Sequence, residues 1–184
     1  MKRRQFINIF VLLSSILFIK PSRLLASINS VMLGRKAPDF ILNGFNKNNP
    51  DKKEWSLDDF SGEWLILYFY PKDFSSGCTL QAKAFQDNLS KFKKLNSSVV
   101  GISADNEEEH ESFCTSAKLG YTLLSDTTGE ISKSYDSWLD PYSKRNTFLI
   151  NPEGIIVYKW IGVRPLDHAQ EVLEELTKQQ KLYA

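Results

Sequence analysis

Residues 64–78 read WLILYFYPKDFSSGC, and this stretch carries most of the information about the fold. Its first seven residues are all apolar or aromatic and rich in strand formers, which is typical of a strand covered on both faces. Pro71 ends the strand because it has no amide hydrogen for the ladder. Beyond a short loop, apolar residues recur at helical spacing from Leu80 to Phe92, so a helix is expected to begin near Cys78.

Strands and helices alternate along the rest of the chain. Apolar runs predict strands at 99–103 and 121–124, with a helix between them that Asp105 caps and Gly120 ends. The sequence Asn-Pro-Glu-Gly at 151–154 suits a type I turn, so the apolar runs beside it predict a hairpin. The remaining expectations are short extended pieces over 31–45, a polar loop over 46–53, a short helix over 130–135, hairpin strands at 147–150 and 155–160, and a helix over 167–179.

This order of elements predicts an α/β fold. Alternating strands and helices give parallel pairing with helices on both faces of the sheet, and the hairpin adds antiparallel strands. The result is a thioredoxin-like sandwich with a central mixed sheet. Residues 27–184 number 184 − 26 = 158, which suits a single domain with one substantial core.

The first 26 residues have the pattern of an export signal. Lys2, Arg3 and Arg4 precede an apolar run over 6–19 of about 14 residues, which is shorter than the roughly 20 that a membrane span needs. The segment RRQFI over 3–7 resembles a twin-arginine signal. An ordinary secretory signal or an uncleaved anchor is the alternative. We expect residues 1–26 to be removed on export to a periplasm or a thylakoid lumen, with no stable membrane contact afterwards.

Composition excludes several classes of function. Without residues 1–26 the chain has 18 basic and 22 acidic residues, a formal net charge of −4 that makes it a poor partner for nucleic acid. Two cysteines cannot form a disulfide-dense scaffold or a four-thiolate metal site. His110 is expected to be a solvated helix residue, and His168 to have no chemical role.

Cys78 is the candidate nucleophile. It lies where a helix begins beyond the carboxyl end of the central strand, and the free N–H groups and positive end of that helix favour a thiolate. The alternative is a buried, inert cysteine. A Cys-x-x-Cys redox motif would need a second cysteine three residues on, where the sequence has Gln81, so that type of dithiol exchange is excluded.

Residues 68–79 resemble the active-site segment of peroxiredoxins of the bacterioferritin comigratory protein, or peroxiredoxin Q, subfamily. The family pattern Pro-x-x-x-Thr/Ser-x-x-Cys is met by Pro71, Ser75 and Cys78. Four further segments match the family in order: GRKAPDF at 34–40, GISAD at 101–105, LLSD at 123–126 and RNTFLI at 145–150.

The resemblance implies a role for each of these residues. Cys78 would be the peroxidatic thiolate, which attacks a hydroperoxide and becomes a sulfenic acid. Arg145 would stabilise the thiolate and orient the peroxide, and Ser75 would hydrogen-bond to both. Pro71 would shield the sulfur from water, and backbone N–H groups near Gly77 would hold the developing negative charge.

Lys83 stands five residues after Cys78, where many members of the subfamily carry the resolving cysteine. Cys114 is the remaining candidate, and the resemblance to some peroxiredoxin Q members favours it. Disulfide formation needs Cα atoms within about 7 Å, so both helices would have to loosen. Three possibilities stay open for Cys114: a resolving thiol, an inert cysteine in a one-cysteine enzyme, or half of a permanent disulfide.

The sequence therefore predicts an exported thiol peroxidase. It would reduce hydrogen peroxide and organic hydroperoxides and be re-reduced by thioredoxin or a similar dithiol donor, with no metal, flavin or nucleotide cofactor. The resemblance further implies a monomer. Two alternatives are a thiol–disulfide exchange enzyme and a non-catalytic peroxide-sensing or binding module on the same fold.

Overall fold

The computed structural model describes residues 33–183, so the expected export signal at 1–26 lies outside the described residues. The strands are β1 (Ile41–Phe45), β2 (Glu54–Ser56), β3 (Trp64–Phe69), β4 (Ser97–Ser103), β5 (Thr122–Ser125), β6 (Trp138–Leu139), β7 (Tyr142–Ser143), β8 (Thr147–Ile150) and β9 (Ile156–Trp160). The helices are η1 (Leu57–Phe60), α2 (Ser76–Lys94), α3 (Glu107–Ala117), α4 (Glu130–Ser134) and α5 (His168–Tyr183).

The strands form the mixed sheet that the sequence predicts. Its order is β2-β1-β5-β4-β3-β8-β9, with β6 and β7 in a separate two-stranded sheet. Strand β3 lies inside the sheet, parallel to β4 and antiparallel to β8, and every residue of β3 is buried. The uninterrupted apolar run of β3 is explained by this position, because both of its faces are covered.

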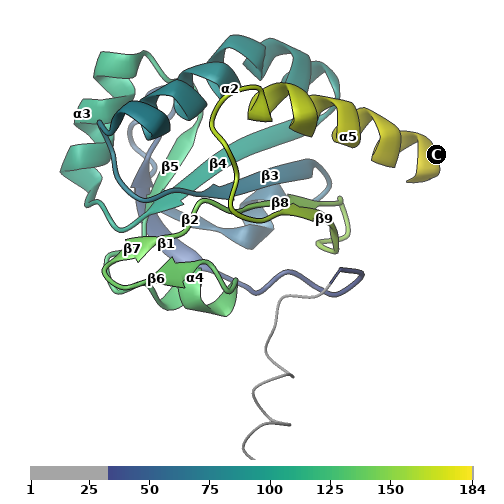
Figure 1. Cartoon of the computed structure of the whole chain (residues 1–184), viewed down its shortest axis with the longest axis horizontal. Coiled ribbons are helices and arrows are strands. Elements are labelled where there is room, and N and C mark those ends of the chain that lie inside the picture. The colour runs from purple at the N-terminus through teal and green to yellow at the C-terminus, as the bar shows by residue number, and fades with distance from the viewer. Residues whose placement is uncertain (1–32, 184) are drawn as a thin grey trace, which may run out of the picture.

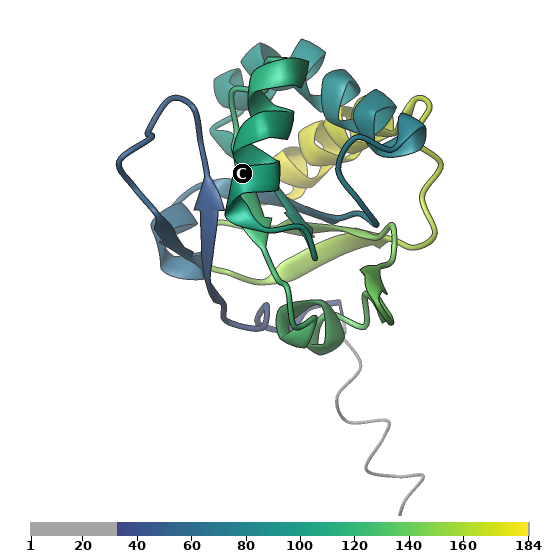
Figure 2. The same ribbon diagram turned by 90° about the vertical axis from the view of Figure 1, so that its left-hand side faces the viewer.

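Helices cover both faces of the sheet, but unequally. Helices α2, α3 and α5 lie together on one face, while η1 and α4 lie on the other (Figures 1 and 2). Alternate residues of β3 supply the two cores: Ile66 and Tyr68 pack with the three long helices, and Leu65 and Leu67 pack on the other side. The thioredoxin-like sandwich is confirmed, with its larger core under α2, α3 and α5.

The ends of α3 differ from the expected ones. Asn106, rather than Asp105, is the N-cap: its side chain accepts from the N–H of Glu109, whose carboxylate accepts from the N–H of Asn106. The helix ends at Ala117, before Gly120, because Lys118 takes the left-handed conformation at φ 57°. Asp105 is thereby left free to bond elsewhere.

The edge of the sheet beyond β5 was expected only as short extended pieces. Strand β1 pairs antiparallel with both β5 and β2, and the polar loop predicted over 46–53 joins β1 to β2. Within residues 33–183, no helix has the length and apolar character needed to cross a bilayer.

Candidate active site

Cys78 lies in the first turn of α2, at the carboxyl end of β3. Ser75 is the N-cap of this helix, and no acidic residue occupies the first turn. The side chain of Cys78 is 1% exposed. Because the first N–H groups of a helix have no partner within it, they make this end of α2 positive and favourable for an anionic sulfur.

Arg145 contacts Cys78 directly, as the sequence predicts. Arg145 is 67 residues from Cys78 in the sequence. It precedes β8, and the antiparallel pairing of β8 with β3 places it beside the start of α2. Its Nη2 donates to Cys78 Sγ at 3.2 Å, and its Nη1 donates to Gln81 Oε1 at 2.6 Å. The guanidinium thus faces the sulfur, the position in which a fixed positive fork could assist chemistry at that atom.

Gln81 holds the guanidinium in place. Gln81 is fully buried, and its Nε2 has no hydrogen-bond partner among the described residues. The guanidinium also passes close to Gly77, where a Cβ would lie in ordinary contact, 3.4 Å from Arg145 Nη2 and 3.5 Å from Pro165 Cγ. The sequence predicted no contact between Gln81 and Arg145. The structure shows Gln81 as the anchor of Arg145.

Ser75 and Pro71 lie in the loop between β3 and α2. The Ser75 hydroxyl donates to the carbonyl of Lys72 at 3.0 Å, and the Ser75 carbonyl accepts from the N–H of Thr79 at 2.8 Å. Ser75 therefore closes the loop and starts the helix, and its expected bond to the thiolate stays a prediction. Pro71 is half-buried and follows the end of β3 by two residues, close to the strand end that the sequence predicts.

Cys114 lies in α3 and is fully buried. Burial, and to a smaller extent the negative charge of Asp73, raises the pKa of its thiol to about 12, so the group is a neutral thiol at physiological pH. Cys78 and Cys114 are both free thiols in this structure.

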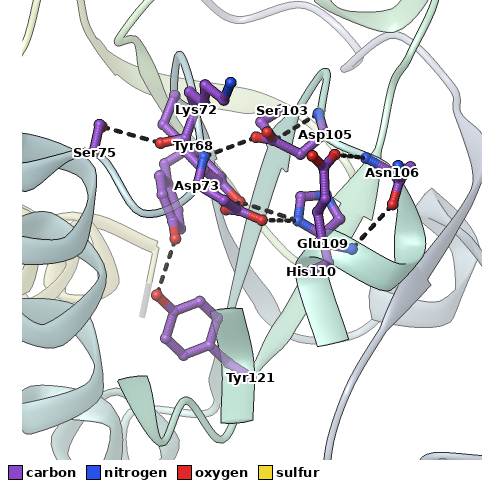
Figure 3. A network of polar contacts seen from close by, with 11 residues as sticks. Tyr68, Lys72, Asp73, Ser75, Ser103, Asp105, Asn106, Glu109, His110 and Tyr121 are labelled. Carbon is purple, nitrogen blue, oxygen red and sulfur yellow. Dashed lines mark hydrogen bonds and ion pairs between the residues drawn. The ribbon is translucent and has the colours of Figure 1, made fainter. Parts of the chain in front are cut away.

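Asp73 is the centre of a buried polar network (Figure 3). Its carboxylate accepts from the Tyr70 hydroxyl at 2.8 Å and lies 2.7 Å from His110 Nδ1, while its N–H donates to Asp105 at 2.8 Å. The prediction that His110 is solvated is wrong, since its side chain is fully buried. Helical spacing was the available signal, because His110 shares one face of α3 with Phe113, Cys114 and Ala117.

His168 is also buried, at the start of α5. Its ring packs edge-to-face against Phe85 and Trp160, and its Nε2 lies 2.9 Å from Thr147 Oγ1. Burial lowers the pKa of His168 to about 4, so the imidazole is neutral at physiological pH. Its ring contributes to the packing between α5, α2 and β9.

The arrangement suits nucleophilic chemistry at sulfur. Over residues 33–183, no group of three or more His, Cys, Asp or Glu side chains is placed to hold a metal ion. What the site offers is a thiol at a positive helix end, with a guanidinium 3.2 Å from the sulfur. A helix-terminal nucleophilic cysteine on a thioredoxin-like sheet defines a thiol-dependent oxidoreductase.

Comparison with known proteins narrows this class. The model of the AhpC/TSA family matches residues 33–159, and the chain belongs to this family. It is 33% identical to Peroxiredoxin Bcp of Bacillus subtilis over 155 residues, which cover 80% of this chain and 96% of that protein. It is 40% identical to a putative peroxiredoxin bcp of Helicobacter pylori over 152 residues, which cover 78% and 97% of the two chains.

Solved structures agree with these relatives. Xanthomonas campestris peroxiredoxin Q superposes with a TM-score of 0.70 at 29% identity, covering 76% of this chain and 90% of that one. A Plasmodium vivax 2-Cys peroxiredoxin gives a TM-score of 0.75 at 29% identity, covering 82% and 98%. The resemblance to the Bcp and peroxiredoxin Q subfamily is confirmed, and with it the class of activity, a thiol-dependent peroxidase.

Proposed function

We propose that Cys78 reduces hydrogen peroxide and organic hydroperoxides with the assistance of Arg145. The thiolate attacks the terminal oxygen, the O–O bond breaks, and the leaving oxygen takes up a proton to give water or an alcohol. Sulfur is oxidised to a sulfenic acid and the peroxide is reduced. The observation that carries this proposal is the 3.2 Å contact from Arg145 Nη2 to Cys78 Sγ, which places positive charge where the attacking and leaving atoms are negative.

Organic hydroperoxides are part of the proposal for two reasons. Phe74 and Leu80 flank the first turn of α2 and are 54% and 48% exposed, so they offer an apolar approach to the site. A solved structure of the Xanthomonas campestris bacterioferritin comigratory protein is described in terms of alkyl peroxide reduction. An alkyl chain would contact these side chains while its peroxide group faces Arg145.

In the next step, Cys114 would resolve the sulfenic acid. Its sulfur attacks Cys78, the S–O bond breaks, a disulfide forms, and the thiol proton leaves with the hydroxyl group as water. Cys78 and Cys114 are 114 − 78 = 36 residues apart. Two solved structures of Xanthomonas campestris peroxiredoxin Q are Cys-to-Ser variants at positions with the same separation. This shared spacing favours Cys114 over a one-cysteine mechanism.

The disulfide would then be reduced by thioredoxin or a similar dithiol donor, acting on a monomer of this chain. The basic and apolar pattern of residues 1–26 supports export through the twin-arginine route, with residues 27–184 as the mature domain in a periplasm or a thylakoid lumen. Cleavage at this point is testable by the N-terminal sequence of the protein recovered from its compartment.

Intact mass after one equivalent of peroxide, without reductant, tests the chemistry. The wild type should lose two hydrogens, Cys114→Ser should gain oxygen at Cys78, and Cys78→Ser should not react rapidly. Oxygen addition to the wild type without a disulfide would make this a one-cysteine enzyme. No rapid change in either the wild type or Cys114→Ser would overturn the peroxidase mechanism itself.

Steady-state turnover with a dithiol donor separates the alternatives. A peroxidase consumes many equivalents of peroxide, whereas a sensing or binding module would react once and stop. A thiol–disulfide exchange enzyme would reduce a model disulfide as fast as it reduces peroxide.

A further inference from the structure

The loop that precedes Cys78 contacts α3, the helix that carries Cys114. We define the peroxidatic loop as residues 71–75. Its Asp73 contacts His110 of α3 at 2.7 Å, and its Phe74 packs edge-to-face on Phe113 of the same helix, with 5.1 Å between ring centroids. Both partners lie within one turn of Cys114 on α3.

Of these two contacts between the peroxidatic loop and α3, the Asp73–His110 contact joins buried, ionisable side chains. The side chains are 1% and 0% exposed, so neither group has water as an alternative partner. Asp73 is held from three further directions: by Tyr70, by the Asp105 carboxylate at its N–H (Figure 3), and by Ser75, whose N–H donates to the Asp73 carbonyl at 2.8 Å. Breaking such a buried pair is far more costly than breaking an exposed one.

The backbone of the loop is strained in this conformation. Phe74 has a φ of 59°, in the left-handed region that residues with a side chain rarely adopt. It is 54% exposed, so burial of its own ring does not explain the conformation. The contacts of the neighbouring Asp73 and the packing of Phe74 on Phe113 hold the loop there, and their release would relieve the strain.

Cys78 and Cys114 are buried in separate helices, and both are free thiols in this packing. In the proposed cycle at least one helix end unwinds to bring the two sulfurs together, and the contacts between the peroxidatic loop and α3 oppose that movement. Oxidation of Cys78 replaces a thiolate with a sulfenic acid and weakens the attraction of Arg145. The contacts of Asp73 then hold the oxidised loop in place.

We propose that Asp73 and His110 form a latch that joins the peroxidatic loop to α3 and sets the rate at which Cys114 resolves oxidised Cys78. This inference rests on the proposed role of Cys114. The two residues are positioning residues, since neither touches the peroxide or either sulfur. While the latch is closed, the sulfur of the sulfenic acid can attack the terminal oxygen of a second peroxide. The O–O bond breaks, the leaving oxygen takes up a proton to give water or an alcohol, and the sulfur becomes a sulfinic acid, so the latch also sets the sensitivity of the enzyme to over-oxidation.

Asp73 also acts on the second cysteine. Its charge is one of the two causes that raise the pKa of Cys114, the larger being burial. Opening the latch removes the carboxylate from α3 and lets the helix expose its thiol. Cys114 therefore becomes a better nucleophile through the same movement that brings it closer to Cys78.

Rapid mixing with peroxide, followed by acid quenching and intact mass, measures oxidation and disulfide formation separately. His110→Leu removes the ring nitrogen and should form the disulfide about tenfold faster than the wild type. It should also need about tenfold more peroxide to reach half-maximal sulfinic acid. An unchanged or slower rate of disulfide formation in His110→Leu overturns the proposal.

Three further variants serve as controls. His110→Asn keeps a donor near the position of Nδ1 and should restore the wild-type rate of disulfide formation. Asp73→Asn keeps the size of the side chain and removes its charge, so it replaces His110→Leu if that variant fails to fold, and it should accelerate disulfide formation. Leu176→Ala destabilises α5, away from the loop and α3, and should leave that rate unchanged; an acceleration there would mean that stability alone sets the rate.

Hydrogen exchange of reduced protein separates this proposal from the proposed function. Residues 107–117 should exchange faster in His110→Leu than in the wild type, whether or not Cys114 forms a disulfide. If the wild type forms no disulfide, the resolving role of Cys114 fails whatever the exchange result. If the disulfide forms but exchange over 107–117 is unchanged, the latch fails and the peroxidase cycle stands.

Discussion

The two cysteines of this protein are equally buried, yet the charged groups beside them differ. Cys78 lies at the positive end of α2 with a guanidinium 3.2 Å away. Cys114 lies inside α3, where burial and the charge of Asp73 raise its pKa to about 12. Exposed area alone therefore does not identify a reactive cysteine in this fold. The sign of the nearby charge and the position within the helix do.

In the proposed mechanism, this difference separates the reactions of the two cysteines in time. The groups that would assist the reaction of Cys78 are already in place in the folded protein. Burial in α3 would keep Cys114 from competing for peroxide until the helix opens, which the proposal also requires for contact with Cys78.

The largest effect expected from the difference between the two cysteines is on their rates of alkylation. At pH 8, Cys114 of the reduced protein should react with iodoacetamide about 10³-fold more slowly in the folded state than in urea, because a thiol with a pKa near 12 is almost entirely protonated. Cys78 should show a far smaller difference between the two states. Peptide mass mapping over time measures both rates, and equal folded-state rates for the two cysteines would contradict the comparison.

Removing the Arg145 guanidinium should greatly slow the reaction of Cys78 with peroxide. Arg145→Ala is expected to slow oxidation by peroxide by about 10²-fold, and Arg145→Lys by less, since lysine keeps the charge without the planar fork. Stopped-flow or quenched-flow rates measure this. Arg35→Ala removes the same charge from an exposed position near β9 and should stay within about threefold of wild type. A similar loss in both variants would mean that net charge, not the contact, matters.

Removing Gln81, the partner of Arg145, should slow oxidation by peroxide less than removing Arg145 itself. Gln81→Ala leaves Arg145 Nη1 without its partner at 2.6 Å, so the guanidinium samples other positions and oxidation should slow by about tenfold. Gln86→Ala is the matched control on the same helix, because its side chain bonds the N–H of Gly120 instead. Gln86→Ala should lower stability without changing the oxidation rate. An unchanged rate in Gln81→Ala would show that Arg145 holds its position without help.

The smallest expected effect is on the free energy of unfolding and concerns the protonation of His168. The unfolded chain protonates His168 near pH 6.5, but the folded protein does so only near pH 4, so the free energy of unfolding should fall as pH drops through this range. The loss from this group is at most about 3 kcal/mol. Urea midpoints between pH 7 and 4.5 should fall less steeply in His168→Gln. Parallel curves for the two proteins would exclude this imidazole as the cause.

Much of the fold follows from short stretches of the sequence. The apolar run of β3, the turn at 151–154 and the helical spacing after Cys78 are local patterns, and the structure contains the strand, hairpin and helix that they predict. Edge elements were predicted less well. Strand β2 has three residues and β6 and β7 have two each, so no periodic pattern develops along them.

The candidate site, like the fold, has parts that local sequence predicts and parts that it does not. Cys78 can be located from the sequence because a helix start after a buried strand is a local feature. The contacts of Gln81 and His110 could not be located, since each partner lies far away in the chain: Arg145 is 64 residues from Gln81, and Asp73 is 37 residues from His110. Resemblance pointed to Arg145, but not to the side chain that anchors it.

The position of Cys78 at a helix start can be predicted from local sequence, because strand, breaker and helix follow one another within fifteen residues and each depends on local propensity and pattern. The charges that surround each sulfur depend on the packing of distant segments. The pairing of β3 with β8 brings Arg145 to Cys78, and the packing of α3 beside the peroxidatic loop brings Asp73 to His110 and close to Cys114. Electrostatic interactions act through space, so the chemistry of these two thiols depends on contacts that no local pattern records.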